Sequence, residues 1–526
     1  MQLFALSSSR IMKGLRHPYS LAAFSGVLFA LSFPTYSIFI SAWIFLVPLL
    51  FALPEKSSQD AARLGFVAGF LGNLGVVYWV VHSVHVYGNV PLFFSIIVML
   101  VLVTYLAFYF SAFAVIASHF LVFPHLLPFV LAFAWVLLEY AKGLLFTGFP
   151  WENLGYSQMP MLPLVQIADI GGVYVVSFLV VFANSSLFLA LAYVGRKMIK
   201  CIYTLLALLL IAGTLAYGSF QLNYFHDVVD LRMDNGIPVA LLQGNIPQDI
   251  KWEPSQQEHT IQRYRSLATK ANISKGIIVF PEAAMPFLLD RQEDYKAIIT
   301  EVMRSSASWG IVGSLALQSE TPLSVSNSAF VISPAGKITE RYDKVHLVPF
   351  GEYVPRWVPF VQKLVAGIGD IQPGTDFRAV QVGNIAAGIL ICYETIFPAI
   401  AREYVLGGAT LLVSITNDGW FGNTSAPFQH MNMATMRAIE SRRFLLRVAN
   451  TGISAIVSPT GKILAKTEVF ETALLVGNIV PLTKTSIYSR HGDWFVFFCL
   501  LGISLAWIAK LIYLRSKRIA GAKDGR

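Results

Sequence analysis

The sequence predicts a membrane protein in two parts: an α-helical domain of eight membrane spans, and an α/β domain inserted before the last span. Three observations support this prediction. A mean hydropathy of +0.61 over 526 residues is too high for a soluble enzyme. Apolar runs of spanning length recur through the first 222 residues and once more near the C-terminus. Between them, charged residues return and β-branched runs alternate with helical patterns.

The apolar runs are long enough to cross a bilayer, which takes about 20 helical residues. A basic stretch precedes the first run, but no small-residue cleavage site follows it, so we expect an uncleaved anchor. Glycines at close spacing in the third run predict tight helix packing. The predicted spans are 19–33, 36–53, 64–86, 91–122, 126–142, 162–194, 201–221 and 493–514.

Basic residues in the short loops predict the orientation of these spans. With strict alternation, four clusters of basic residues fall on one face, which the positive-inside rule assigns to the cytoplasm. The net charge of +9 therefore indicates membrane topology rather than nucleic-acid binding. We expect spans one to seven in 1–222, an extracytoplasmic domain in 223–490, and span eight with a basic tail in 491–526. The basic groups are Arg10, Lys13 and Arg16; Lys56 and Arg63; Arg196, Lys197 and Lys200; and Arg515, Lys517, Arg518 and Lys523.

The segment 223–490 has the pattern of a layered α/β domain that can bury its own core. Two Ser-Pro-x-Gly-Lys turns, at 333–337 and 458–462, predict hairpins. The predicted helices are Gln256–Ala271, Asp294–Ser305 and Phe397–Leu406. The predicted strands are Ile237–Gln243, Gly276–Phe280, Gly310–Leu317, Ala329–Ile332, Ile385–Ile391, Thr410–Thr416 and Ala455–Val457.

One cysteine lies where a reactive thiol is expected. Cys392 ends an apolar strand and precedes a helix, whose N–H groups favour thiolate over thiol. Cys201 and Cys499 flank or lie within apolar spans, so Cys392 has no plausible disulfide partner. No cysteine and histidine spacing suits zinc, and we expect no metal. Cys392 is therefore either a nucleophile or a buried core residue.

A carboxylate and an amine also lie at predicted strand ends. Glu282 follows the strand that ends in Phe280-Pro281, and Lys344 follows Tyr342-Asp343. Side chains at the carboxyl ends of strands tend to meet in one crevice. There, Glu282 could carry the thiol proton, while Lys344 lowers the thiol pKa and stabilises an oxyanion. Singly, each residue has an ordinary structural explanation, and only the combination indicates catalysis.

The motifs around these three residues resemble the Glu–Lys–Cys motifs of the nitrilase superfamily. With the flanking spans, the whole chain is similar to its membrane-bound branch, the apolipoprotein N-acyltransferase family. The motifs keep the family's order along nearly all of the chain. They are Gln243–Pro247, Phe280–Glu282, Tyr342–Glu352, Ile391–Glu394 and Asn417–Gly422.

The resemblance implies a nitrilase-like α-β-β-α sandwich on an eight-helix base, in a bacterial inner membrane with the catalytic domain in the periplasm. It also implies acyl transfer without a cofactor. Cys392 would take an acyl chain from a phospholipid, typically phosphatidylethanolamine, as a thioester. The acceptor would be the α-amino group of a diacylglyceryl-cysteine that begins an apolipoprotein. Glu282 would be general base and acid, and Lys344 the oxyanion stabiliser. Supporting or substrate-binding positions would be Glu352, Trp252, Tyr393, Glu394 and Trp420.

Some alternatives stay open at this point. A membrane-bound amidase or nitrilase with the same triad could act on a small substrate, and a transporter or receptor could merely bind lipid or peptide. The apolar stretch 354–361, which contains Trp357, could be a lid at the membrane interface or ordinary packing. Glu139 and Lys142, at the end of span five, could form a satisfied ion pair or part of a proton relay, and the spacing favours the ion pair. The aromatic loop 146–156 could be an interfacial belt or one wall of a lipid entry.

Overall fold

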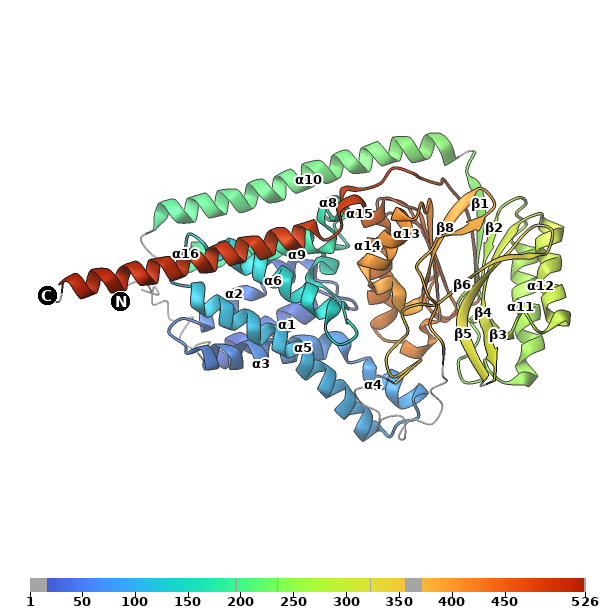
Figure 1. The fold of residues 1–526 in the computed structure, drawn as a ribbon, viewed down its shortest axis with the longest axis horizontal. Helices are drawn as coiled ribbons and strands as arrows, with labels where there is room; N and C mark the ends of the chain where they lie inside the picture. Colours follow the sequence, from blue (N-terminus) through green and yellow to red (C-terminus); the bar gives the residue numbers. More distant parts are fainter. Residues whose placement is uncertain (1–16, 194–195, 234, 322, 355–370, 525–526) are drawn as a thin grey trace. The chain divides into compact units, whose positions relative to one another are not determined.

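A computed structural model describes residues 17–193, 196–233, 235–321, 323–354 and 371–524 (Figure 1). The chain forms two compact units. The helical unit comprises Met1–Tyr78, Leu100–Ala216 and Asp493–Arg526, and the sheet unit comprises Trp79–Met99 and Tyr217–Gly492. The predicted lid around Trp357 lies outside the described residues, so it stays a prediction.

Six helices in the described part of the chain are long and apolar enough to cross a membrane. This finding supports the predicted membrane protein. The helices are α3 (Ser58–Val77), α5 (Leu92–Phe120), α6 (Leu127–Leu144), α9 (Val173–Ala192), α10 (Lys197–Met233) and α16 (Trp494–Asp524).

The first two predicted spans, 19–33 and 36–53, fall on shorter helices. α1 (Pro18–Leu31) has 14 residues, or about 21 Å, against a hydrocarbon core of about 30 Å. The second run is divided between η2 (Phe39–Trp43) and α2 (Leu46–Ala52). Apolar length along the chain therefore overestimated helix length here, and the structure supports six spans rather than clearly eight.

Two further predicted spans are interrupted. α3 ends at Val77, and residues 80–87 form the short α4 (Val80–His82) and a π-helix, η3 (Ser83–Tyr87). The run 162–194 breaks at Gly172, whose φ of +69° is a conformation that glycine adopts without steric cost. Its parts are α7 (Leu162–Val165), α8 (Ala168–Gly171) and α9, preceded by η4 (Leu154–Gln158).

The glycines of α3 allow the close helix packing that their spacing predicts. A Cβ at Gly65 would lie 2.4 Å from the Phe110 carbonyl oxygen of α5. On the neighbouring helix α1, a Cβ at Gly26 would lie 2.4 Å from the Ala68 carbonyl oxygen of α3. The three backbones therefore approach more closely than larger residues would permit.

The sheet unit contains two sheets. The first has seven strands in the order β13-β1-β2-β4-β5-β6, with β3 beside β4, and the second has six in the order β12-β11-β10-β9-β8-β7. First-sheet strands are β1 (Ile237–Gln243), β2 (Ile277–Val279), β3 (Met285–Leu288), β4 (Trp309–Glu320), β5 (Leu323–Ile332), β6 (Ile338–Asp343) and β13 (Ala473–Ile479). Second-sheet strands are β7 (Val380–Val382), β8 (Ile385–Ile391), β9 (Leu411–Thr416), β10 (Leu445–Ala449), β11 (Ala455–Val457) and β12 (Ile463–Lys466).

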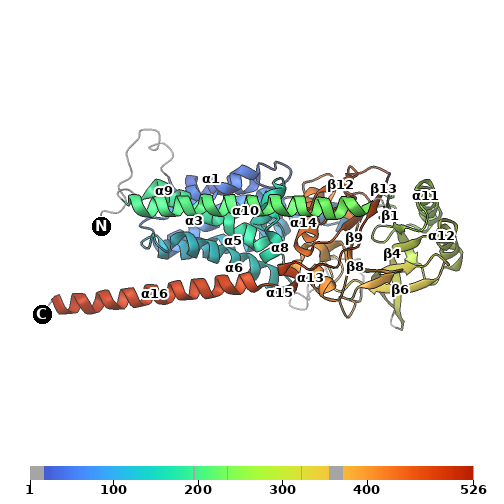
Figure 2. The ribbon, with the colours of Figure 1, turned by 90° about the horizontal axis from the view of Figure 1, so that it is seen from above.

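Helices cover the outer faces of both sheets, which gives an α-β-β-α sandwich (Figures 1 and 2). α11 (Gln257–Lys270) and α12 (Glu293–Ser306) pack on the first sheet through a shared apolar core. α13 (Pro398–Leu406) and α14 (Ala426–Ser441) pack on the second. Shorter helices are η5 (Pro254–Gln256), η7 (Cys392–Ile396), η8 (Asp418–Phe421) and α15 (Ile487–His491).

All seven predicted strands are present, and the two predicted hairpin turns join antiparallel pairs, β5 to β6 and β11 to β12. The strands β1, β2 and β4 run parallel, as do β8, β9 and β10. Parallel strands end at the same sheet edge, so residues that follow β2 and β8 are placed at carboxyl edges.

Candidate active site

Cys392 directly follows β8 and begins the short helix η7. Its φ is +53°, in a left-handed region that side-chain-bearing residues rarely adopt. Such strain persists only where the surrounding structure imposes it, and it concentrates at functional sites. The turn leaves the Cys392 side chain half-buried, whereas Ile391 before it is fully buried.

Glu282 and Lys344 lie together in a buried polar network. The Lys344 ammonium is 3.6 Å from Glu282 Oε1 and 2.9 Å from Glu352 Oε1. Asn327, on β5, donates through Nδ2 to the same two oxygens, at 2.7 Å for Glu282 and 3.2 Å for Glu352. The backbone N–H of Asn417 donates to Glu282 Oε2 at 2.8 Å. The structure therefore brings both predicted strand-end residues together, with Glu352 as a second carboxylate.

The charges in this network act on the thiol. Burial, and secondarily the Glu282 carboxylate, raise the pKa of Cys392 above its ordinary value, and the Lys344 ammonium offsets only part of this increase. The expectation that helix N–H groups make the thiol more acidic is therefore wrong. Burial also lowers the pKa of Lys344, but Glu352 and Glu282 outweigh it and raise that pKa overall. Both raised pKa values favour a protonated thiol beside a charged ammonium.

A second buried lysine, Lys251, belongs to this site. Its Nζ donates to the backbone carbonyl of Glu282 at 3.1 Å, and its side chain has no exposed surface. Burial lowers the pKa of Lys251 to about 8, against the opposing pull of Glu282 and Cys392. The Lys251 ammonium also lies 5.9 Å from the centroid of the Trp252 ring.

Glu394 holds the cysteine turn in place. It is fully buried, and its Oε1 accepts hydrogen bonds from the Tyr342 hydroxyl at 2.7 Å and the Val345 N–H at 2.8 Å. Its Oε2 accepts from the Ile391 N–H at 2.8 Å. Glu394 thereby links the residue before Cys392 to the segment that carries Lys344.

Three aromatic side chains from the predicted set differ in exposure. Tyr393 is nearly buried and lies 5.2 Å from the Phe397 ring. Trp252 and Trp420 are 44% and 42% exposed, which leaves both available to a ligand. The Trp420 backbone carbonyl accepts a hydrogen bond from Ser83 Oγ at 2.8 Å, so the segment after α3 holds the η8 loop.

A buried charged cluster contacts the backbone of the cysteine turn. His430 Nε2 lies 3.2 Å from the Cys392 carbonyl oxygen, and His430 Nδ1 lies 3.0 Å from Asp418 Oδ1. Arg447 donates to Asp418 Oδ2 at 2.7 Å. Arg447 and His430 lower the pKa of the Asp418 carboxyl to about 2, in spite of its burial. These contacts fix the strained turn at Cys392.

Sequence reasoning missed Lys251, Asn327, Asp418, His430 and Arg447. Lys251 adjoins the selected Trp252, and Asp418 lies inside the selected motif Asn417–Gly422. Arg447 is a charged residue in an otherwise apolar strand, which was an available signal. Asn327 and His430 carried no comparable local signal. In the described part of the chain, no cluster of histidine, cysteine and acidic residues is arranged to hold a metal.

Two family models match the chain. The apolipoprotein N-acyltransferase N-terminal domain matches residues 25–186, and the carbon-nitrogen hydrolase domain matches residues 238–486. An apolipoprotein N-acyltransferase of Geobacter metallireducens is 43% identical over 520 residues, which cover 95% of this chain and 96% of that protein. The chain belongs to the apolipoprotein N-acyltransferase family.

Other members of the apolipoprotein N-acyltransferase family agree with this assignment. The one from Vibrio vulnificus is 33% identical over 94% of this chain and 97% of its own length. Among solved structures, an amidase from Nesterenkonia sp. matches 49% of this chain and 96% of its own at 19% identity and a TM-score of 0.37, from which we draw no argument. The chain is thus a bacterial acyltransferase with apolar membrane helices and a carbon-nitrogen hydrolase domain, and the amidase alternative is not favoured.

Proposed function

We propose that this protein moves a fatty acyl chain from a phospholipid, typically phosphatidylethanolamine, through a Cys392 thioester to the N-terminal diacylglyceryl-cysteine of an apolipoprotein. The buried contact of Lys344 with both Glu282 and Glu352, at the strand ends beside the half-buried thiol, supports this chemistry most strongly. It supplies a proton acceptor and a fixed cation for one nucleophile.

In the first step, Glu282 accepts the thiol proton as sulfur attacks the ester carbonyl. The raised pKa of Cys392 means that proton removal has to accompany attack. Lys344 stabilises the oxyanion of the tetrahedral intermediate. When the intermediate collapses, the carbon–oxygen bond breaks, and Glu282 returns the proton to the departing lysophospholipid.

In the second step, the neutral α-amino group of the acceptor attacks the thioester carbonyl. Glu282 takes a proton from the attacking nitrogen, and Lys344 again stabilises the oxyanion. The carbon–sulfur bond breaks, and the proton passes to sulfur, which restores the thiol. A thioester retains enough acylating power to form an amide, so the reaction requires no ATP and no metal.

The remaining residues have supporting roles in this proposal. Glu352 and Asn327 hold the Lys344 and Glu282 side chains in position, and Glu394 positions the cysteine turn. Trp252 and Trp420 contact substrate, which their exposure supports. Tyr393 adjoins the nucleophile and lines the same region.

The membrane arrangement belongs to the proposal as well. We assign 1–222 and 491–526 to the membrane, with the shorter helices α1 and α2 completing eight segments. Residues 223–490 form the catalytic domain, on the periplasmic side of the inner membrane. The basic loops support this orientation.

A transfer assay tests the proposal. The purified protein is given radiolabelled phosphatidylethanolamine and a diacylated lipopeptide, and both products are quantified. We expect lysophospholipid and N-acylated peptide in equal amounts, with neither formed by Cys392→Ala. Ammonia release from small amides without lysophospholipid would instead support the amidase alternative.

A further inference from the structure

One short segment from the first part of the chain belongs to the sheet unit. Residues 79–99 group with that unit, whereas the rest of the described chain before Tyr217 groups with the helical unit. The segment begins with α4 and the π-helix η3, which ends at Tyr87. A π-helix is rare and occurs frequently at functional sites. The contacts of this segment within the sheet unit therefore indicate what it does.

This segment contacts the end of the η8 loop through several side chains. Ser83 Oγ donates to the Trp420 backbone carbonyl at 2.8 Å. The Tyr87 ring packs edge-on against the Trp420 ring, with 5.5 Å between the two ring centroids. The Trp79 ring packs in the same way against the Phe421 ring at 5.0 Å. Both the backbone and the ring of Trp420 are thereby held from one segment.

The backbone after η8 approaches the same segment closely. A Cβ at Gly422 would lie 2.1 Å from His82 Nε2, so only glycine fits there without a shift. The φ of Gly422 is +59°, a conformation that glycine adopts without steric cost. Trp79 is itself fixed by α14, because its Nε1 donates to the buried Gln429 Oε1 at 3.1 Å. The segment is therefore a firm support for the loop.

The opposite end of η8 is held by the catalytic residues. The Asn417 N–H donates to Glu282 Oε2 at 2.8 Å, and Asp418 belongs to the buried charged cluster. Trp420 follows two residues later, and 42% of its side chain is exposed. The catalytic residues therefore fix where η8 begins, and the segment 79–87 fixes where it ends.

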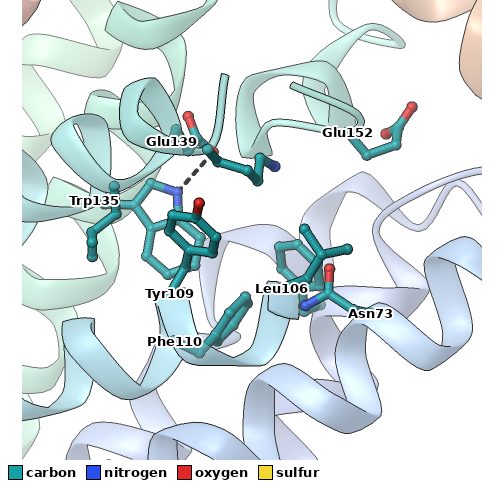
Figure 3. Close-up of a pocket in the computed structure, with 10 residues that line it drawn as sticks. Asn73, Leu106, Tyr109, Phe110, Trp135, Glu139 and Glu152 are labelled. Atoms are coloured by element: carbon teal, nitrogen blue, oxygen red, sulfur yellow. Dashed lines mark hydrogen bonds between the residues drawn. The ribbon is translucent and has the colours of Figure 1, made fainter. Parts of the chain in front are cut away.

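The helical unit holds a loop of its own in a different setting. Figure 3 shows Glu139 beside Trp135 at a small cavity of that unit. Glu139 Oε1 accepts hydrogen bonds from Trp135 Nε1 at 2.8 Å and from the Leu154 N–H at 2.6 Å, which ties the start of η4 to α6. These contacts stay within the helical unit, whereas those of the segment 79–87 end on a loop that presents an exposed tryptophan.

We propose that Ser83 and Tyr87 are positioning residues for the reaction, which hold Trp420 in the orientation that contacts the acyl donor. The proposal rests on the proposed function in one respect, since the contact of Trp420 with substrate comes from there. Ser83 fixes the backbone at Trp420. Tyr87 fixes the ring, because an edge-on aromatic pair favours one relative orientation. Both residues act on the substrate through Trp420 rather than on the reacting atoms.

The proposal predicts a change in substrate saturation without a change in the chemical step. Tyr87→Leu removes the ring, so Trp420 should spend less time in the competent orientation. The half-saturating lipid concentration should rise about 2- to 12-fold, which corresponds to the loss of one aromatic pair. The maximal rate of Cys392 acylation should stay the same, because the Asn417 contact with Glu282 is kept. Tyr87→Phe retains the ring and should restore wild-type saturation.

Single-turnover acylation of the full-length protein tests this prediction. Phosphatidylethanolamine is supplied in mixed micelles at graded concentrations, and intact mass follows the acyl-enzyme, which gives the half-saturating concentration and the maximal rate. A double-mutant cycle with Trp420→Ala shows whether Tyr87 acts through Trp420. We expect Tyr87→Leu to add nothing to the effect of Trp420→Ala. Tyr36→Leu, which removes an exposed tyrosine of the helical unit, is the matched control and should change neither quantity.

Equal saturation of Tyr87→Leu and the wild-type protein would overturn the proposal, as would an effect of Tyr87→Leu that persists in the Trp420→Ala protein. A lower maximal rate at unchanged half-saturation would also overturn it, because Tyr87 would then support the chemical step.

Hydrogen exchange of residues 418–422 tests the role of Ser83 without turnover. Ser83→Ala removes one hydrogen bond, so amide exchange in this loop should become about 2- to 12-fold faster at an unchanged melting temperature. Unchanged exchange would contradict the support that Ser83 gives to Trp420. Failure of the proposed function would appear separately, as absence of Cys392 acylation in the wild-type protein.

Discussion

Replacement of Glu282 by glutamine separates two effects that the geometry assigns to one carboxylate. In the proposed mechanism Glu282 is the proton acceptor for Cys392, and its charge also raises the pKa of the thiol. Glutamine keeps the size of the side chain but removes both the charge and the basic oxygen. In the wild-type protein the Glu282 carboxylate accepts hydrogen bonds from the Asn327 amide at 2.7 Å and from the Asn417 N–H at 2.8 Å. The glutamine amide would face the same two donors.

The two effects have opposite signs. A neighbouring like charge raises a pKa by about 1–3, so Glu282→Gln should lower the pKa of Cys392 by a similar amount. Loss of a general base should slow acylation by about 10²–10⁴-fold. The variant should therefore have a more readily ionised thiol and yet a much slower reaction with lipid.

Two measurements on one preparation test this prediction. The pH dependence of iodoacetamide alkylation of Cys392, followed by intact mass, reports the thiol pKa. Single-turnover acylation by phospholipid reports the chemical step. Glu301→Gln, an exposed carboxylate on α12, serves as the control and should change neither. Acylation at the wild-type rate, or an alkylation midpoint shifted to higher pH, would refute the role given to Glu282.

Three further predictions follow from other parts of the structure. Lys251 has its pKa lowered from 10.5 to about 8, so between these values the unfolded chain binds a proton that the folded protein does not. The free energy of unfolding should therefore rise with pH across that window, by about 3 kcal/mol in total. Thermal melts of Lys251→Met should lack this rise. An equal rise in both proteins would contradict the burial of the ammonium. Asp418→Asn leaves the buried Arg447 without its charged partner and should lower the free energy of unfolding by about 3–5 kcal/mol, measured as a lower melting temperature. Replacing the exposed Asp376 by Asn should change the melting temperature little. Equal melting temperatures for the two variants would argue against the supporting cluster. Trp357→Ser should slow label transfer from lipid to peptide if residues 354–361 act as a lid, and an unchanged rate would count against that interpretation.

Local sequence patterns predicted the sheet unit well where strands are apolar and bounded by turns. β1, β8 and β11 have the predicted bounds, because β-branched runs end there at polar or turn residues. β13 was not predicted, since it pairs with β1 across the whole domain and carries no strong local pattern. β10 was not predicted either, because Arg447 interrupts its apolar run. Only the folded structure supplies the Asp418 carboxylate that allows this arginine to be buried.

The site shows the same division between local and tertiary information. Glu282, Lys344 and Cys392 could be selected because each follows a strand, and strand ends share an edge. Lys251 could not, because nothing in its neighbourhood of polar residues indicates that its side chain is buried. The predicted direction of the Cys392 pKa change was wrong for a related reason. The helix N–H groups are a local feature, whereas burial and the Glu282 charge depend on tertiary packing.

Intact-mass analysis of the purified enzyme after exposure to phospholipid tests the central claim most directly. We predict a gain of one acyl mass on the wild-type protein, none on Cys392→Ala, and loss of the added mass when a diacylated lipopeptide is supplied. An enzyme that transfers acyl chains at its normal rate without ever carrying this mass, or that carries it on another residue, would contradict the account.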